Sequence, residues 1–310
     1  MLKILVLGSG AGGGSPQWNC NSDVSKAVRN GEPGTSPRTQ SSIVVTANED
    51  EWFLFNASPD LGSQILKNKQ MHPQKDPRHS PISGVVLTNG DVDHVAGLLT
   101  LRERQNLSIY AHERVHSVLK ENSIFNVLNP DYVDRRKLNM NEEFELMNKD
   151  NKGVGLLVEA FAVPGKIALW LEDESKGENF GSDDGDTIGL KITSKADDKS
   201  FYYIPACARM TNELSARLSG SEMVLFDGTL WENEEMASSK VGEKTGQRMG
   251  HMNNSGKDGS IQAFKDLGVK RKIFIHINTT NPILLEDSKE RKIVEENGWE
   301  VSYDGMEINL

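Results

Sequence analysis

The sequence predicts an α/β protein in which two halves, each built of strands and then helices, pack as a sandwich of sheets with helices outside. Short apolar stretches that alternate like strands dominate the first hundred residues, and helical patterns follow them. A second strand-rich block begins near residue 153 and is again followed by helical patterns. No linker separates the halves, so we expect a single domain over residues 1–310.

The first half is expected to contain four strands and two helices. The strands are KILVLG (3–8), SSIVVTA (41–47), WFLFN (52–56) and ISGVVLT (82–88). Apolar residues at helical spacing predict one helix over 95–105, directly after Asp93 and His94, and another over 112–122, with His112 near its start.

The second half is expected to contain more strands. They lie at 153–163, 166–172, 187–194, 200–206, 222–229, 271–277 and 299–303, with helices at 211–220, 261–267 and 288–298. The acidic segment EDESKGENFGSDDGD (172–186) is interpreted as an exposed, solvated hairpin tip, because charged runs of this composition cannot bury themselves.

A glycine-rich stretch follows the first predicted strand. Gly8, Gly10 and Gly13 have the G-x-G-x-x-G spacing of a dinucleotide-binding turn. That fingerprint functions only where the glycines lead into a helix whose N-terminus faces the pyrophosphate. Residues 17–22 show no helical periodicity, and the next regular stretch is the strand at 41–47. Because the required helix is not predicted after the glycines, the context of the motif argues against a dinucleotide site.

Composition excludes several classes of partner. The formal net charge is −10 and no stripe of Lys or Arg is present, which argues against nucleic-acid binding. No apolar run approaches the length of about 18 residues that a membrane span needs, so we expect no membrane span. The first apolar run is too short for a signal peptide, and Cys20 and Cys207 cannot form a disulfide framework. These features predict a cytoplasmic protein.

Polar clusters follow the apolar strands at four places: NGDVDH, PGK, a stretch containing RMGH, and NTTNP. Ligands in open α/β folds bind beyond strand ends. Asp93 and His94, adjacent at a strand-to-helix turn, can point at one ion, and His276 at a strand end can supply a third ligand. A single His in a strand is more often a hydrogen-bonded core residue, but the three together favour a metal site.

These residues resemble, in this order, the signature of the metallo-β-lactamase superfamily: H-x-H-x-D-H, a PGH turn, an Asp or Cys bridge and a last His. The match places Asn89, Asp91, Asp93 and His94 on the first motif, Lys166 on the PGH histidine, and His276 on the last histidine. The resemblance implies the four-layer αβ/βα sandwich of that superfamily.

Departures from the signature indicate which metal site is retained. The resemblance places Asn89, Asp91 and Lys166 where the superfamily holds its first metal with three histidines. An ammonium at that place repels a cation, so we expect the first site to be empty, with Lys166 and Asp91 forming an ion pair there.

The second metal site keeps its ligands. The resemblance leaves Asp93, His94 and His276, and two histidines with one carboxylate are the ligand set of non-haem Fe(II) oxygenases. The same three ligands would also accept zinc.

Longer motifs are similar to the pyrroloquinoline quinone (PQQ) biosynthesis protein B family, PqqB, from end to end of the chain. They include GGGSPQWNC, NASPD, LTNGDVDHVAGLLTLRE, LWLED, DGTLWE, EKTGQRMGH, HINTTNPILLEDSKER and GWEVSYDG. The resemblance implies a role in making PQQ from a Glu and a Tyr of a ribosomal peptide. It further implies iron-dependent hydroxylation of the tyrosine-derived ring of a small Glu–Tyr precursor, with O2, an external reductant and other PQQ biosynthesis proteins as partners.

Two other functions remain open. An older proposal for the family is transport or carriage of the cofactor or a precursor, which would need binding but no metal chemistry. A zinc-dependent hydrolase on the same fold would need a metal in the first site, and Lys166 argues against it.

A zinc motif of the family is broken in this chain. Members often carry C-x-C-x-x-C after QWN, whereas this sequence has Cys20, Ser22 and Ser25. A serine hydroxyl does not replace a thiolate as a zinc ligand, so we predict no structural zinc there.

A candidate general base comes from the second half. Asp227 ends one predicted strand and His251 follows RMG, so the carboxylate can hydrogen-bond and orient the imidazole as a base for ring protons. A pair that only braces the loop is the alternative interpretation.

Four further residues are candidates near the site. Arg209 and Arg248 could bind substrate carboxylates, since a guanidinium grips a carboxylate with two hydrogen bonds. Cys207 falls near the superfamily's bridging-ligand position and is interpreted either as a near-site residue or as a buried structural thiol. Trp18 could stack on an aromatic ring or close the core.

Overall fold

The computed structural model describes residues 1–176 and 182–310. The strands of its first sheet are β1 (Lys3–Gly8), β2 (Ser42–Thr46), β3 (Trp52–Phe55), β4 (Ile82–Val86), β5 (Leu107–Ala111), β6 (Val133–Lys137) and β14 (Glu307–Asn309). Those of the second are β7 (Glu143–Met147), β8 (Gly153–Ala162), β9 (Ile188–Ser194), β10 (Ser200–Ile204), β11 (Met223–Asp227), β12 (Arg271–Ile275) and β13 (Trp299–Val301).

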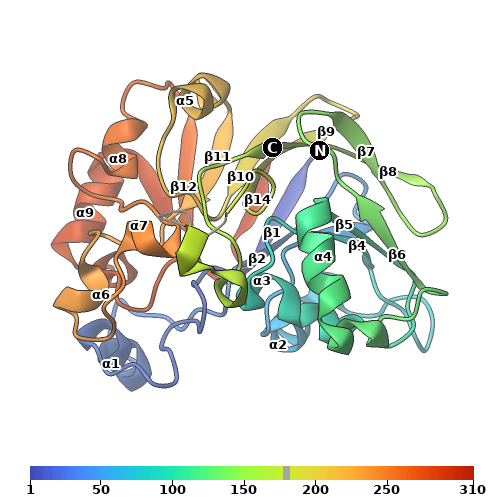
Figure 1. Cartoon of the computed structure of the whole chain (residues 1–310), viewed down its shortest axis with the longest axis horizontal. Coiled ribbons are helices and arrows are strands. Elements are labelled where there is room, and N and C mark those ends of the chain that lie inside the picture. The colour runs from blue at the N-terminus through green and yellow to red at the C-terminus, as the bar shows by residue number, and fades with distance from the viewer. Residues whose placement is uncertain (177–181) are drawn as a thin grey trace.

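Nine α-helices lie in the described residues. They are α1 (Asp23–Asn30), α2 (Leu61–Lys67), α3 (Val92–Val95), α4 (Glu113–Glu121), α5 (Asn212–Leu218), α6 (Glu235–Ser238), α7 (Gly246–Met249), α8 (Ser260–Ala263) and α9 (Lys289–Glu296). Figure 1 shows α2 and α4 on one flank and α5, α8 and α9 on the other, with the sheets between them. The predicted sandwich of sheets with outer helices is confirmed.

The strand order explains where a site can form. The first sheet runs β14-β1-β2-β3-β4-β5-β6 and the second runs β13-β12-β11-β10-β9-β8-β7. Strands β3 to β6 are parallel to one another, and so are β10 to β13. Because parallel strands end at one edge of a sheet, the segments that follow β4, β11 and β12 can gather polar groups there.

Three apolar layers hold the four structural layers together. Between the sheets, Phe55 of β3 meets Tyr203 of β10 edge to face, with ring centroids 6.3 Å apart. Outside the second sheet, Phe274 of β12 stacks on Trp299 at 4.0 Å, and Phe264 packs against the same indole. A third cluster packs the helices of the first half against the first sheet.

Two predicted elements are wrong. Residues 166–172 form no strand: they bend into a 3-10 turn at Leu169–Leu171, because the Pro164–Gly165 turn directs the chain away from the sheet. At Gly165 a Cβ would lie 2.4 Å from Thr187 Oγ1, so only glycine fits. The helix predicted over 95–105 is replaced by the short α3 and a 3-10 turn at Ala96–Leu101.

Some elements were not predicted. Helix α1 lies between the glycine-rich stretch and β2, where no regular structure was expected, and α2 was also missed. Strands β5, β6, β7 and β14 were missed too. Strand β6 reads VDRRK, and such a polar edge strand carries no apolar alternation.

The acidic segment 172–186 is not simply a solvated tip. Glu172 is 8% exposed and pairs with Lys166 and Arg248, while the buried Asp186 accepts two hydrogen bonds from Arg114. The middle of this segment, 177–181, lies outside the described residues. The described ends of the segment thus take part in partly buried ion pairs.

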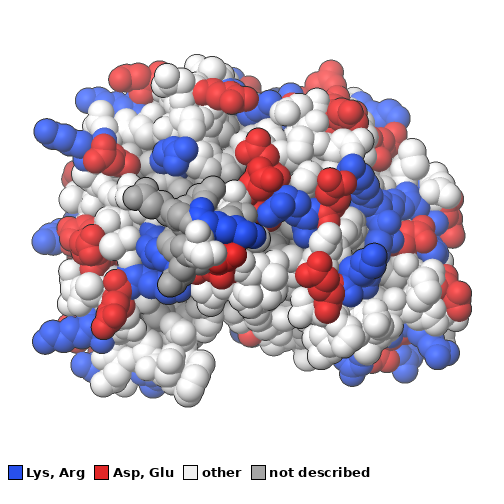
Figure 2. Space-filling view, viewed as in Figure 1, with Lys and Arg blue, Asp and Glu red and all other residues white. Residues whose placement is uncertain are grey.

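The molecular surface carries both signs of charge. On the face in Figure 2, Lys and Arg side chains are interspersed with Asp and Glu rather than gathered into a basic stripe. No helix among the described residues is long and apolar enough to cross a lipid bilayer.

Candidate metal centre

Candidate site residues converge at the carboxyl-terminal ends of three parallel strands. Asp93 and His94 lie in α3 after β4, Asp227 ends β11, and His276 directly follows β12. The backbone of His276 is in the left-handed region, with φ of 61°. Such a conformation costs a non-glycine residue on the order of 1 kcal/mol or more and is typical of functional sites.

The three predicted ligands lie together. Asp93 Oδ2 is 3.0 Å from His276 Nε2 and 3.9 Å from His94 Nε2. One ligand atom from each residue can be chosen so that all lie within 4.8 Å of one another. A carboxylate oxygen and two imidazole nitrogens at this spacing surround a position that a metal ion can occupy.

A hydrogen bond to Asn89 orients one of the proposed ligands. His94 is buried, and its Nδ1 lies 2.7 Å from Asn89 Oδ1, which also accepts a hydrogen bond from Asp91 N. An amide oxygen only accepts, so His94 carries its proton on Nδ1 and directs the Nε2 lone pair toward Asp93. His94 Nε2 has no hydrogen-bond partner among the described residues. A buried imidazole nitrogen without a partner fits a metal ligand.

The remaining polar groups form a network behind His276. Asp227 is fully buried, and its carboxylate accepts hydrogen bonds from Cys207 N at 2.8 Å and from the Thr229 hydroxyl at 2.6 Å. His251 Nδ1 donates to Asp227 Oδ2 at 2.7 Å. Thr229 Oγ1 also lies 2.9 Å from His276 Nδ1, so one hydroxyl links the candidate base to the candidate ligand. The predicted hydrogen bond between Asp227 and His251 is confirmed.

Electrostatics favours the charged forms of Asp93 and His276 and the neutral form of His94. Burial alone would raise the pKa of Asp93, but the neighbouring His94 and His276 bring it well below its usual range. Burial alone would lower the pKa of His276, but its hydrogen bond to Asp93 raises it. Burial lowers the pKa of His94 to about 4, so this imidazole is neutral at physiological pH and can donate its lone pair. Metal and protons therefore compete for this cluster.

Comparison with known proteins identifies the family. The Beta-lactamase superfamily domain matches residues 51–277. "Coenzyme PQQ synthesis protein B" of Rhodopseudomonas palustris (strain BisB5) is 50% identical over the full length of both chains, and its namesake in Methylorubrum extorquens (strain AM1) is 47% identical, again over full length. The chain belongs to the PqqB family.

A solved PqqB structure has the same fold. Zn²⁺-bound PqqB from Methylobacterium extorquens superimposes with a TM-score of 0.93 at 46% identity, covering 99% of this chain and 100% of that one. A diphosphatase of the PhnP family, with a TM-score of 0.69 at 18% identity, shows the likeness of fold alone. The implied metallo-β-lactamase fold is confirmed.

The predicted ion pair between Lys166 and Asp91 is wrong in this PqqB chain. Lys166 Nζ lies 3.1 Å from Glu172 Oε1, and Arg248 Nη2 lies 2.7 Å from Glu172 Oε2. Asp91 instead accepts a hydrogen bond from Leu169 N at 3.1 Å. Burial raises the pKa of Asp91, although Lys166 opposes the shift. Lys166 pairs with Glu172 and not with Asp91 because residues 166–172 turn back over the site and place the Glu172 carboxylate beside Lys166.

A cavity of about 430 Å³ opens onto the proposed ligands. The predicted site residues in its lining are Asn89, Asp91, Asp93, His94, Lys166, His251 and His276. The lining also includes Thr229, Lys244 and Met249, which the sequence analysis missed. Thr229 stands two residues after Asp227 in DGT, and Lys244 lies in the EKTG motif, so motif context was the available signal.

Other predicted near-site residues do not line this cavity. Arg209 is exposed, and Arg248 is engaged by Glu172. Trp18 is 86% exposed, so it does not close the core. Cys207 is completely buried and its Sγ donates to Arg209 O, while burial raises the pKa of the thiol. Cys207 therefore contributes to the site through its backbone N–H, which holds Asp227.

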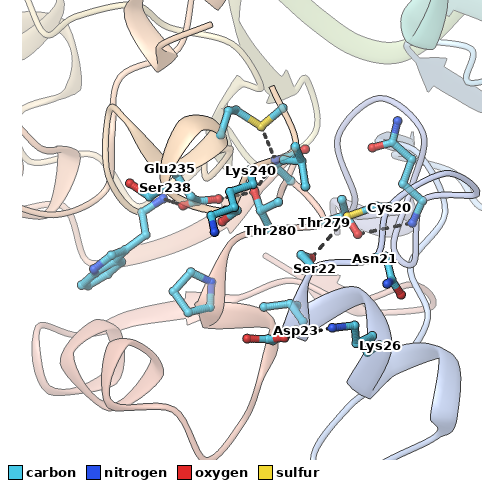
Figure 3. Close-up of a pocket in the computed structure, with 18 of the residues that line it drawn as sticks. Cys20, Asn21, Ser22, Asp23, Lys26, Glu235, Ser238, Lys240, Thr279 and Thr280 are labelled. Atoms are coloured by element: carbon cyan, nitrogen blue, oxygen red, sulfur yellow. Dashed lines mark hydrogen bonds and ion pairs between the residues drawn. The ribbon is translucent and has the colours of Figure 1, made fainter. Parts of the chain in front are cut away.

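A second and larger cavity, of about 1030 Å³, lies beside the broken PqqB zinc motif (Figure 3). There Cys20 Sγ lies 3.3 Å from Ser22 Oγ, and Ser25 Oγ lies 2.7 Å from Thr279 Oγ1. Both metal-type clusters in the described part of the chain lie elsewhere, around His276. We therefore place the chemistry in the smaller cavity.

Proposed function

We propose that this chain acts in the synthesis of coenzyme PQQ by hydroxylating the tyrosine-derived ring of a small Glu–Tyr precursor, with Fe(II) as the metal. The observation that carries the proposal is the convergence of Asp93, His94 and His276, with the buried His94 Nε2 unpartnered among the described residues. The full-length similarity to proteins named for coenzyme PQQ synthesis supports the biosynthetic role. Two histidines and one carboxylate are the ligand set of non-haem Fe(II) oxygenases.

The reaction replaces a ring C–H by C–OH. Iron held by these ligands would supply the activation of O2. One oxygen atom enters the ring and the other leaves as water, which needs two electrons from an external reductant and two protons. The ring proton that is lost must be taken up by a base in the cavity.

His251 is the base that we propose. Its Nδ1 is engaged by Asp227, which fixes the tautomer and leaves Nε2 available to accept a proton. The ring of His251 stacks beside that of His276, with centroids 5.1 Å apart, so the base lies next to the metal position. Asp227 stabilises the imidazolium that forms when His251 accepts the proton.

Zinc hydrolysis is the second candidate, because the similar PqqB of Methylobacterium extorquens was solved with Zn²⁺. Hydrolysis with two bridged metals would need a cation where Lys166 lies, and Lys166 and Arg248 already surround Glu172. That arrangement supports a mononuclear site, which Fe(II) or Zn²⁺ would occupy through the same three ligands.

The test is a labelled turnover experiment. The protein is loaded anaerobically with Fe(II) or Zn²⁺, mixed with a Glu–Tyr-derived diamino acid and ascorbate, and exposed to isotopically heavy O2. Mass spectrometry is expected to show a labelled oxygen atom in the product with iron and none with zinc. A product whose new oxygen atom is unlabelled and so comes from the solvent, or equal product with zinc, would support the hydrolase. Stoichiometric binding without turnover would support a carrier of PQQ or its precursor.

A further inference from the structure

The walls of the metal cavity are chemically divided. Besides the proposed ligands and His251, apolar side chains contribute to the lining: Ala11, Leu169, Ala206, Met236 and Met249. Two lysines, Lys166 and Lys244, are the cationic side chains that line it within the described residues. A ligand that fits such walls combines an apolar ring with anionic groups.

Lys166 is fixed at the cavity by its neighbours. Glu172 binds both Lys166 and Arg248, and the carboxylate of Asp91 lines the same cavity. Gly250 has φ of 84°, and a Cβ there would lie 3.0 Å from Lys166 Cγ, so glycine leaves room for the lysine stem. The ammonium is therefore held in place beside two carboxylates, those of Glu172 and Asp91, which offset its charge.

Lys244 has a different environment. It lies before α7, whose N-cap is Thr245, and its side chain is exposed where it lines the cavity. Within the described residues no carboxylate pairs with Lys244. An ammonium that lines a ligand cavity without an internal partner is available for an anionic group of a ligand.

We infer that Lys244 binds a carboxylate of the substrate and so selects an aromatic amino acid over a neutral phenol. This inference rests on the proposed function of the same cavity. Lys244 takes the role that the sequence analysis gave to Arg209 and Arg248, which do not line the cavity. It acts as a specificity-determining residue, because it holds the ring against the metal position without touching the reacting atoms.

The test measures binding under anaerobic conditions, with no turnover. Calorimetry compares the metal-loaded parent, Lys244→Gln and the matched control Lys240→Gln, which alters an exposed lysine of the larger cavity. The probes are a Glu–Tyr-derived diamino acid, p-cresol, which has the phenol ring and no charged group, and phenyl phosphate. Loss of a charge-assisted contact is expected to weaken binding of the diamino acid about tenfold to a hundredfold in Lys244→Gln.

Each outcome has one meaning. Weakening in Lys244→Gln but not in Lys240→Gln, with p-cresol bound equally by all three proteins, supports the inference. Unchanged binding of the diamino acid by Lys244→Gln overturns the inference, even if the parent protein hydroxylates the diamino acid. Phenyl phosphate bound more tightly than the diamino acid would overturn the carboxylate assignment. If binding depends on Lys244 but no oxygen enters the product, the proposed function is wrong and the binding role of Lys244 is retained.

Discussion

Asn89 Oδ1 lies 2.7 Å from His94 Nδ1, and this contact decides which nitrogen of His94 faces the metal position. The contact uses a residue that stands where the metallo-β-lactamase signature has its first histidine. In this chain that position supports the proposed ligand His94 instead of supplying a ligand itself.

Asn89→Ala is expected to weaken metal binding about tenfold to a hundredfold, because the imidazole of His94 loses the acceptor that fixes its tautomer. Competition with a chromophoric chelator measures the affinity for Fe(II) and Zn²⁺. Asn19→Ala, in the larger cavity, is the matched control and should bind metal like the parent. Equal affinities of Asn89→Ala and the parent would show that the contact is merely structural.

Asp93→Ala and His276→Ala are each expected to lose the bound metal and the activity while the fold is retained. Both side chains lie beyond strand ends and outside the apolar layers. Elemental analysis after gel filtration measures the metal, and far-UV circular dichroism measures the fold. A folded variant that keeps a full equivalent of iron would remove that residue from the ligand set.

His251→Asn is expected to lower kcat about a hundredfold or more while leaving the metal content near that of the parent, since the variant lacks the base but keeps the three ligands. Steady-state kinetics with metal analysis on the same sample checks this. Loss of metal together with kcat would instead make His251 a ligand, which the alternative cluster of Asp227, His251 and His276 permits. An unchanged kcat would leave His251 as a brace for its loop.

Much of the fold could be predicted because apolar periodicity records which faces are buried. The alternation in β8 and the fully buried β2 and β3 follow this rule. Strand β6 and helix α1 were missed for the same reason: β6 is a polar edge strand, and α1 is only eight residues long. Contacts with residues distant in the sequence stabilise such elements, and a short window of sequence does not include those residues.

Site residues could be predicted where their chemical type indicates their role. The direction in which a side chain points, and so its partner, was harder to predict. Asp93, His94 and His276 could be grouped from their places after predicted strands and from the resemblance to the superfamily signature, and the structure brings them together. The partner of Lys166 could not be predicted, because Glu172 reaches it only through the turn after Gly165. Arg248 has the chemistry of a carboxylate anchor but binds an internal carboxylate.

Glu235 is expected to make stability fall as pH rises. Burial raises the pKa of this carboxyl to about 7, although hydrogen bonds from Thr280 Oγ1 and Trp231 N, each 2.5 Å long, oppose the shift. The folded state therefore keeps a proton that the unfolded chain releases near pH 4.5, so folding binds a proton between these values. From about pH 5 to about pH 8 the free energy of unfolding should drop by about 2 kcal/mol more in the parent than in Glu235→Gln, whose amide does not ionise. Urea unfolding at both pH values measures the difference, with the exposed Glu234→Gln as control. The same pH slope in Glu235→Gln and the parent would show that Glu235 is ionised throughout this range.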